Sequence, residues 1–103
     1  MNRLEILSME AGVSLDTLTD KVIFNNEHPL HSPFYSANIR DAFKVVDKML
    51  EDGFISELII STDGNTLARF FDASQIIPDD RSNEMVCETV CEAICKAALL
   101  TKV

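Results

Sequence analysis

Three cysteines near the C-terminal end have spacing that could support chemistry, since Cys87, Cys91 and Cys95 lie four residues apart. In a helix, two thiolates one turn apart could share a soft metal ion. The sulfur of Cys95 would lie about 12 Å from that of Cys87 along the axis, too far for one tetrahedral site. We therefore expect small reduced thiols at the border of a hydrophobic core, as in a reducing cytosol, with a metal or redox role as the alternative.

Two histidines are a second candidate, because His28 and His31 have the spacing His-x-x-His. They lie in a proline-containing segment, residues 25–35, which predicts a loop with no helix to fix their side chains. Metal sites usually combine two ligand pairs, so we expect a solvated loop, with ligation or catalysis as the alternative. The aspartates Asp79 and Asp80 lack the alternating oxygen ligands and the glycine of a calcium loop. Neither segment predicts a metal site.

Sequence motifs typical of enzymes are missing. The chain has three glycines, each of which fits a turn or a helix break. It contains no Gly-rich phosphate loop, no Gly-x-Ser-x-Gly elbow and no His-Glu-x-x-His motif. We therefore expect a protein that is not an enzyme, needs no cofactor and acts by binding.

The balance of charges indicates the kind of partner. The chain of 103 residues carries 17 Asp and Glu against 9 Lys and Arg, for a formal net charge of −8. This excess argues against direct binding to nucleic-acid phosphates and favours a basic surface of another protein. The candidate contacts are carboxylates of an acidic loop and of an outer line on the last helix, namely Asp79, Asp80, Glu84, Glu88 and Glu92. Such a line on a rigid helix could imitate a phosphate backbone.

Hydrophobic periodicity predicts the elements that would position these residues. Apolar residues recur at helical spacing in three segments, and two β-rich segments flank the turn signal Asp63-Gly64. We expect helices over residues 14–24, 38–52 and about 83–100, and strands over residues 54–62 and 66–71. A turn or two of helix is expected before Gly12, and Ile76-Ile77 could add a short edge strand.

Both faces of the predicted sheet are apolar, because Phe54, Leu58 and Ile60 alternate with Ile55 and Ile59. We therefore expect an α+β fold in which a small antiparallel sheet is sandwiched between helices, in α/β/α layers. A length near 100 residues fits one domain, residues 1–103. Because a lone hairpin is marginally stable, we also expect a homo-oligomer, a dimer or higher, formed through a sheet edge or a helix face.

The distribution of apolar residues also predicts where the protein resides. The longest apolar runs are far shorter than the roughly 20 residues that span a bilayer. The N-terminal residues show no secretory signal. We expect no membrane association and a location in the cytoplasm.

Several blocks of sequence, in their order and spacing, resemble a known family. They are Met9-Glu10-Ala11-Gly12, Leu15-Asp16-x-Leu18, Lys21-Val22, Tyr35-Ser36, Ile39-x-x-Ala42-Phe43-x-Val45-Val46-x-Lys48-Met49, Gly53-Phe54, Glu57-Leu58-Ile59 and Glu92-Ala93-Ile94-Cys95-x-Ala97-Ala98-Leu99. Together they resemble the phage ABA-sandwich domain family, small proteins encoded by phages and prophages of Gram-positive bacteria. The resemblance implies an α/β/α layered fold, and it implies no established reaction and no catalytic residues.

For a phage protein, the acidic surface suggests an accessory function exerted in the bacterial host. The leading hypothesis is an inhibitor of a host defence or nucleic-acid-handling protein, of the anti-CRISPR kind, that binds a basic surface. The alternative is an oligomeric sponge that sequesters a nucleotide immune signal in a pocket between subunits. That pocket would be lined by aromatic and basic residues, namely Phe34, Tyr35, Arg40, Arg69 and Arg81. A structural or assembly role without a ligand is the third hypothesis.

Overall fold

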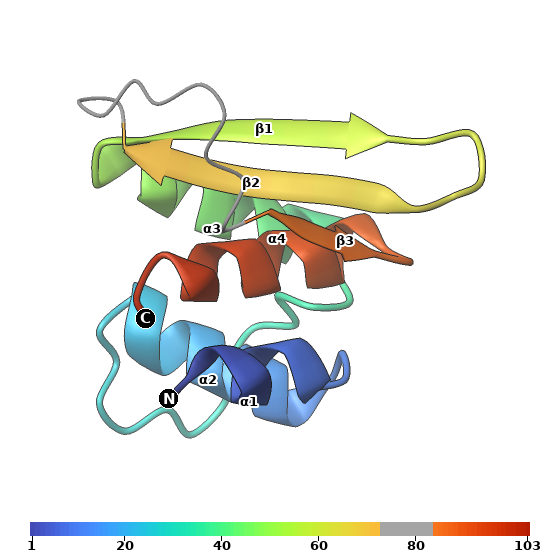
Figure 1. Cartoon of the computed structure of the whole chain (residues 1–103). Coiled ribbons are helices and arrows are strands. Elements are labelled where there is room, and N and C mark those ends of the chain that lie inside the picture. Colours follow the sequence, from blue (N-terminus) through green and yellow to red (C-terminus); the bar gives the residue numbers. More distant parts are fainter. Residues whose placement is uncertain (73–83) are drawn as a thin grey trace.

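The computed structural model describes residues 1–72 and 84–103, in which four helices and three strands follow one another (Figure 1). The helices are α1 (Arg3–Ser8), α2 (Val13–Ile23), α3 (Ile39–Glu51) and α4 (Val90–Leu100). The strands are β1 (Phe54–Ile60), β2 (Thr66–Asp72) and β3 (Met85–Cys87). The short N-terminal helix, the helix before residue 25 and the helix before the hairpin are thus confirmed. The edge strand predicted at Ile76-Ile77 lies outside the described residues.

The α3 helix carries local signals that define both of its ends. Asn38 caps its N-terminus, because the side-chain oxygen accepts hydrogen bonds from the backbone N–H groups of Arg40 at 2.9 Å and Asp41 at 3.3 Å. Gly53 follows its C-terminus with φ of +94°, a left-handed conformation that glycine adopts without strain. The helix predicted over residues 38–52 is confirmed.

The three strands form one antiparallel sheet in the order β1-β2-β3. In the hairpin, Phe54 pairs with Asp72 and Ile60 pairs with Thr66. The connecting turn contains Gly64 with φ of +90°, the conformation that the turn signal in the sequence requires. The predicted hairpin is confirmed, and β3 pairs with the other edge of β2.

The last helix begins later than the sequence predicted, and this expectation was wrong by about seven residues. Met85–Cys87 forms the third strand, and α4 starts at Val90. The hydroxyl of Thr89 caps α4, since it accepts a hydrogen bond from the backbone N–H of Glu92 at 3.2 Å. Val86 fits a helical stripe as well as a strand, so pairing with β2 decides its conformation and local periodicity does not.

The late start of α4 changes how two sets of residues are arranged. Glu84 precedes β3 and Glu88 follows it, so these carboxylates do not continue a helical line from Glu92. Cys87 stands on β3, whereas Cys91 and Cys95 stand on α4. Arguments that rest on regular helical spacing through these residues therefore do not apply to the folded chain.

The α4 helix is the centre of the fold, and its residues from Ala93 to Leu100 are all buried. It packs against β2 and β3, lies beside α3, and contacts α1 and α2 on its other side. The described helices thus lie on one side of the sheet, with α3 and α4 against it and α1 and α2 in a further layer (Figure 1). The α+β class, with an antiparallel sheet packed against helices, is confirmed, whereas the described helices cover one face of the sheet and do not form the expected helical layer on its other face.

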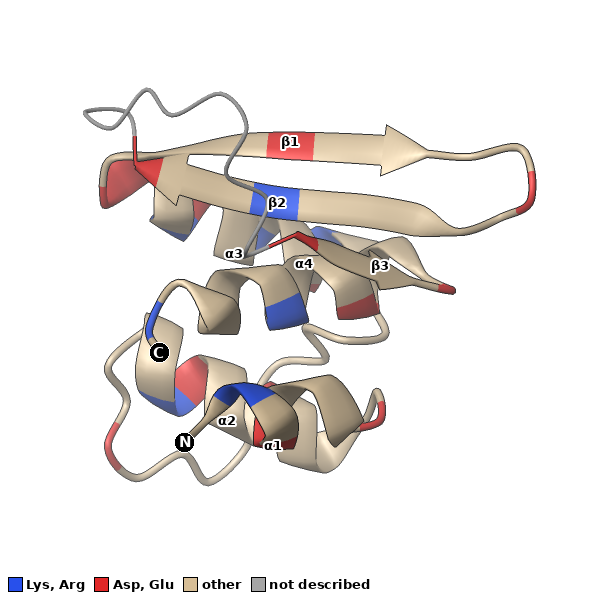
Figure 2. Cartoon of the chain, viewed as in Figure 1, with Lys and Arg blue, Asp and Glu red and all other residues tan. Residues whose placement is uncertain are grey.

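The two faces of the sheet differ in cover, and the alternation predicted for β1 is confirmed. Ala68 and Phe70 of β2 face the helices and are fully buried. On the opposite face Ile55 and Ile59 are about half exposed, at 43% and 48%. Between them Arg69 of β2 forms an ion pair with a carboxylate of β1, seen as adjoining blue and red segments in Figure 2.

None of the helices in residues 1–72 and 84–103 is long and apolar enough to cross a membrane.

Candidate functional site

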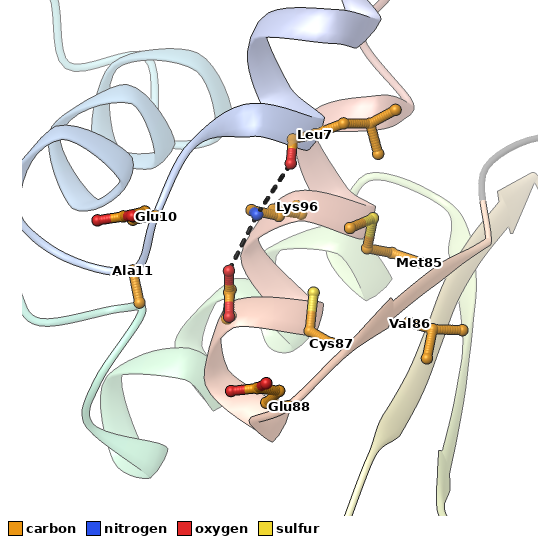
Figure 3. A pocket seen from close by; sticks show the side chains of 9 residues that line it. Leu7, Glu10, Ala11, Met85, Val86, Cys87, Glu88 and Lys96 are labelled. Atoms are coloured by element: carbon orange, nitrogen blue, oxygen red, sulfur yellow. Dashed lines mark hydrogen bonds and ion pairs between the residues drawn. The ribbon is translucent and has the colours of Figure 1, made fainter.

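An open groove lies where the segment after α1 meets β3 and the beginning of α4 (Figure 3). It forms because α1 ends at Ser8 and the extended backbone of Met9 leads the chain away from α4. The groove has a volume of about 410 Å³. Its apolar wall consists of Leu7, Ala11, Met85 and Val86, and its charged residues are Glu10, Glu88, Glu92 and Lys96.

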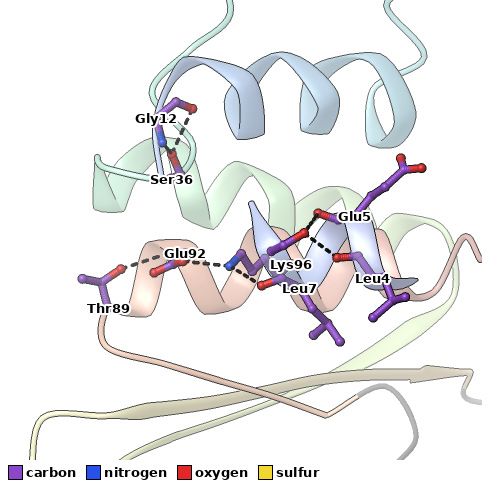
Figure 4. A network of polar contacts seen from close by, with 9 residues as sticks. Leu4, Glu5, Leu7, Gly12, Ser36, Thr89, Glu92 and Lys96 are labelled. Atoms are coloured by element: carbon purple, nitrogen blue, oxygen red, sulfur yellow. Dashed lines mark hydrogen bonds and ion pairs between the residues drawn. The ribbon is translucent and has the colours of Figure 1, made fainter. Parts of the chain in front are cut away.

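A buried ion pair lies within the groove. The Nζ atom of Lys96 is 2.9 Å from Oε1 of Glu92, one turn earlier on α4, and the lysine is 4% exposed. The same ammonium donates a hydrogen bond to the backbone carbonyl of Leu7 at 3.4 Å, near the end of α1 (Figures 3 and 4). The contact offsets the loss of hydration that burial imposes on an ammonium group. Lys96 therefore fastens α1 to α4.

Two further carboxylates flank the groove from opposite ends of the sequence. Glu10 lies on the segment between α1 and α2, and Glu88 lies between β3 and α4. Both residues are exposed, and neither points toward the ammonium of Lys96 in Figure 3. Because Glu92 already neutralises Lys96, Glu10 and Glu88 give the groove a net negative charge. The groove is suited to a cationic group from outside.

The thiol of Cys87 also lines the groove, but its environment keeps it protonated. Burial and, to a smaller extent, the charge of Glu92 raise the pKa of Cys87 to about 11, although Lys96 acts in the opposite direction. Burial likewise raises the pKa of Cys91, and it raises that of Cys95 to about 12. A nucleophilic or metal-binding cysteine needs a thiolate at neutral pH, which these environments disfavour.

The other candidate ligands of a metal ion are dispersed. His28 and His31 are exposed in the loop between α2 and α3. Across residues 1–72 and 84–103, no group of three or more His, Cys, Asp or Glu side chains could hold a metal ion. The structure therefore offers no metal centre among the residues it describes.

The predicted acidic contacts are distributed between this groove and other places. Glu88 and Glu92 line the groove together, while Glu84 precedes β3 and is half-buried. Asp79 and Asp80 lie outside the described residues. Sequence reasoning missed Glu10 and Lys96, because their contribution depends on contacts between the two ends of the chain.

Of the aromatic and basic residues predicted for the alternative pocket between subunits, the four that the structure describes do not come together at one place within one chain. Tyr35 is buried, stacks on Phe24 with ring centroids 5.1 Å apart, and donates a hydrogen bond to Asp20 at 3.4 Å. Burial and the charge of Asp20 raise the pKa of its hydroxyl. Phe34 is 63% exposed nearby. Tyr35 therefore serves the core and is not available to stack on a ligand.

The arginines of the same set lie on different sides of the sheet. Arg69 points to the face away from the helices, where it is within 3.5 Å of Glu57. Arg40 is exposed on α3, which packs against the opposite side. Arg81 lies outside the described residues. Within one chain the sheet separates Arg69 from Arg40, so a pocket that contains both would have to combine residues of two copies.

A second polar cluster holds the loop before α3 in place. The buried carboxylate of Asp16 on α2 accepts two hydrogen bonds of 2.7 Å from Ser36, one from the backbone N–H and one from the hydroxyl. The hydroxyl oxygen of Ser36 in turn accepts a hydrogen bond from the backbone N–H of Gly12 at 2.8 Å (Figure 4). Its groups satisfy one another, so this cluster has a structural role.

Comparison with known proteins identifies a family for this arrangement. The family model of the Phage ABA sandwich domain matches residues 5–99, which include all the described helices and strands except the ends of α1 and α4. No curated protein and no solved structure matches the chain. The matched residues include those of α1, β3 and α4 that surround the acidic groove. Because the family model covers nearly the whole sequence, the chain belongs to the Phage ABA sandwich domain family.

Proposed function

We propose that this phage-family protein is a non-catalytic inhibitor that binds a basic surface of a host defence or nucleic-acid-handling protein. The observation that carries the proposal is the pair of exposed carboxylates, Glu10 and Glu88, in a groove whose lysine is already neutralised. An incoming Lys or Arg side chain would find unneutralised negative charge there. The groove is therefore the part of the described surface at which we place the contact.

The chemistry of the groove supports binding as its task. Its thiol has a raised pKa, and its ammonium group is engaged by Glu92 and by the carbonyl of Leu7. A general base or nucleophile would need a group that is free to react at neutral pH. The apolar wall formed by Leu7, Ala11 and Met85 can instead cover the aliphatic stem of a long basic side chain.

The overall charge supports a partner that handles nucleic acid. Such proteins carry clustered Lys and Arg, whose affinity for phosphates comes largely from counterion release. A chain with a net charge of −8 would be attracted to the same clusters. Attraction of this kind accelerates association and weakens as ionic strength rises.

A comparison of matched charge reversals tests the proposal. Wild-type chain, Glu88→Lys and Glu10→Lys would be immobilised and exposed to lysate of a Gram-positive host, and captured proteins would be eluted with rising salt. Glu27→Lys is the control, because Glu27 is exposed in the loop after α2 and the substitution changes the net charge equally. We expect a basic protein that elutes at moderate salt from wild type and control and is lost from both groove variants.

The identified partner permits a sharper measurement. A nucleic acid bound by that partner should compete with the wild-type chain for it, because both would use the same basic surface. Capture that is equal for Glu27→Lys and for the two groove variants would contradict the assignment of the groove. A partner without a basic surface, or one whose binding is indifferent to salt, would contradict the proposed function.

A further inference from the structure

The β1 strand has the properties of an interface strand. It occupies one edge of the sheet, and no other strand of the described residues pairs with its outer edge. Its seven residues contain no proline and no lysine, and its pairing with β2 runs without a bulge. Proteins normally protect a long edge strand with proline, lysine or a bulge, because an exposed edge pairs readily with another chain.

The side chains around this edge are apolar and incompletely covered. On the helix-facing side of β1, Phe54 and Leu58 are half-buried and Ile60 is 67% exposed. The neighbouring residues of β2 on the same side, Ala68 and Phe70, are fully buried. Cover is thus complete under β2 and incomplete under β1.

The α3 helix extends this apolar surface. Ile39, Phe43 and Leu50 are 49%, 42% and 51% exposed, and their spacing places them on one stripe of the helix. The opposite flank of α3 carries Asp41, which accepts a hydrogen bond from the backbone N–H of Phe34 in the preceding loop at 3.1 Å. Because α3 packs directly against β1, the stripe lies on the flank that adjoins the sheet edge.

Two sequence patterns indicate that the occupant is a second copy of the chain. The outer residues of β1 are symmetric about Glu57, since Ile55 mirrors Ile59 and Phe54 mirrors Ile60, whereas Ser56 mirrors Leu58. An antiparallel pair of β1 strands centred on Glu57 would therefore place Ile55 opposite Ile59 on one face and Phe54 opposite Ile60 on the other, with Ser56 beside Leu58. The residues that meet at the centre are glutamates, each accompanied by Arg69 of its own copy at 3.5 Å.

The exposed charged residues of α3 would also complement those of a second α3 related by a twofold axis. Arg40 and Lys44 lie in the first half of the helix, and Asp47 and Glu51 lie in the second half. In an antiparallel arrangement of two α3 helices, Arg40 would face Glu51 of the second copy and Lys44 would face Asp47. A twofold axis at β1 produces this arrangement, because α3 and β1 are joined by a tight turn and run in opposite directions along each other.

We propose that two copies of the chain form a dimer about a twofold axis near Glu57, with paired β1 edges and adjoining α3 helices. The interface buries the α3 stripe of Ile39, Phe43 and Leu50 and continues one sheet through both copies. The acidic groove lies beside β3, at the other edge of the sheet, so the dimer carries two accessible grooves. The dimer does not depend on the proposed function, and each can fail alone.

Sedimentation velocity and native mass of the full chain test the dimer. We expect wild type at twice the chain mass of 11.5 kDa. Ile60→Lys and Phe43→Lys should weaken dimerisation about tenfold or more, because each places a charge in the interface. Leu30→Lys is the matched control, since Leu30 is 90% exposed in a loop away from β1, and it should remain dimeric.

A charge-reversal rescue identifies the arrangement of the helices. The double variant Arg40→Glu with Lys44→Glu should be mainly monomeric, because each α3 would then present four acidic residues to the four acidic residues of the other copy. Adding Asp47→Lys and Glu51→Lys should restore the dimer. All four positions are exposed in the single chain, so circular dichroism should show an unchanged fold. A monomeric wild type, or a dimer unaffected by Ile60→Lys and by the double variant, would overturn the proposal.

Discussion

At the scale of single residues, two glutamates that the sequence made equivalent have different roles in the structure. Glu88 is exposed at the groove, whereas Glu92 neutralises the buried Lys96 at 2.9 Å. Sequence reasoning could identify both as acidic and near α4. It could not separate their roles, because the burial of Lys96 depends on α1, at the other end of the chain.

We predict that Glu92→Gln destabilises the fold by about 2–4 kcal/mol, because it leaves the ammonium of Lys96 buried without its counter-charge. Glu88→Gln should change the free energy of unfolding by less than about 0.5 kcal/mol, since Glu88 is exposed. Urea denaturation of both variants measures the difference. Equal stability of the two variants would show that the ion pair between Glu92 and Lys96 does not stabilise the fold.

The buried thiols predict a loss of stability in alkaline solution. The folded state raises the pKa of Cys95 from 9.0 to about 12, so the unfolded chain loses this proton at lower pH than the folded chain does. The stability that this pKa difference gives to the folded state is therefore complete below pH 9 and is lost as the pH rises toward 12. Cys95→Ala should be less stable than wild type near pH 7 and should lose less stability on transfer to pH 10. Identical pH dependence in urea denaturation would contradict this.

At the scale of elements, local signals explain what could be predicted. Asn38 and Gly53 define the ends of α3, and Asp63-Gly64 defines the hairpin, because each acts through the backbone of its neighbours. The β3 strand has no such signal. Its three residues are a strand because β2 offers hydrogen bonds, and a contact between distant segments cannot be read from local periodicity.

Elements are also joined by polar contacts that sequence patterns did not reveal. Asp16 of α2 accepts two hydrogen bonds from Ser36, which lies in the segment before α3, and so connects α2 with that segment. We predict that Asp16→Ala destabilises the chain by about 2–3 kcal/mol, because the backbone N–H and hydroxyl of Ser36 lose a buried acceptor. Glu27→Ala, at an exposed position of the loop after α2, is the control for urea denaturation. A loss no larger than that of the control would contradict the role of Asp16.

At the scale of the whole molecule, the fold separates two surfaces that have different chemistry. The groove beside β3 is acidic, and the edge at β1 with the flank of α3 is apolar. The acidic residues near the C-terminal end directed attention to Glu88 and Glu92, which line the groove. Glu10 could not be added from sequence, because it reaches the groove through the packing of α1 on α4.

The central claim is that the acidic groove binds a basic protein surface. Its most direct measurement is isothermal titration of the captured partner with wild type and with the double variant Glu10→Lys/Glu88→Lys, each at low and at high salt. The account predicts a wild-type affinity that falls steeply with salt, and a double variant that binds at least about tenfold more weakly at low salt. Equal affinities of wild type and double variant at low salt would contradict it.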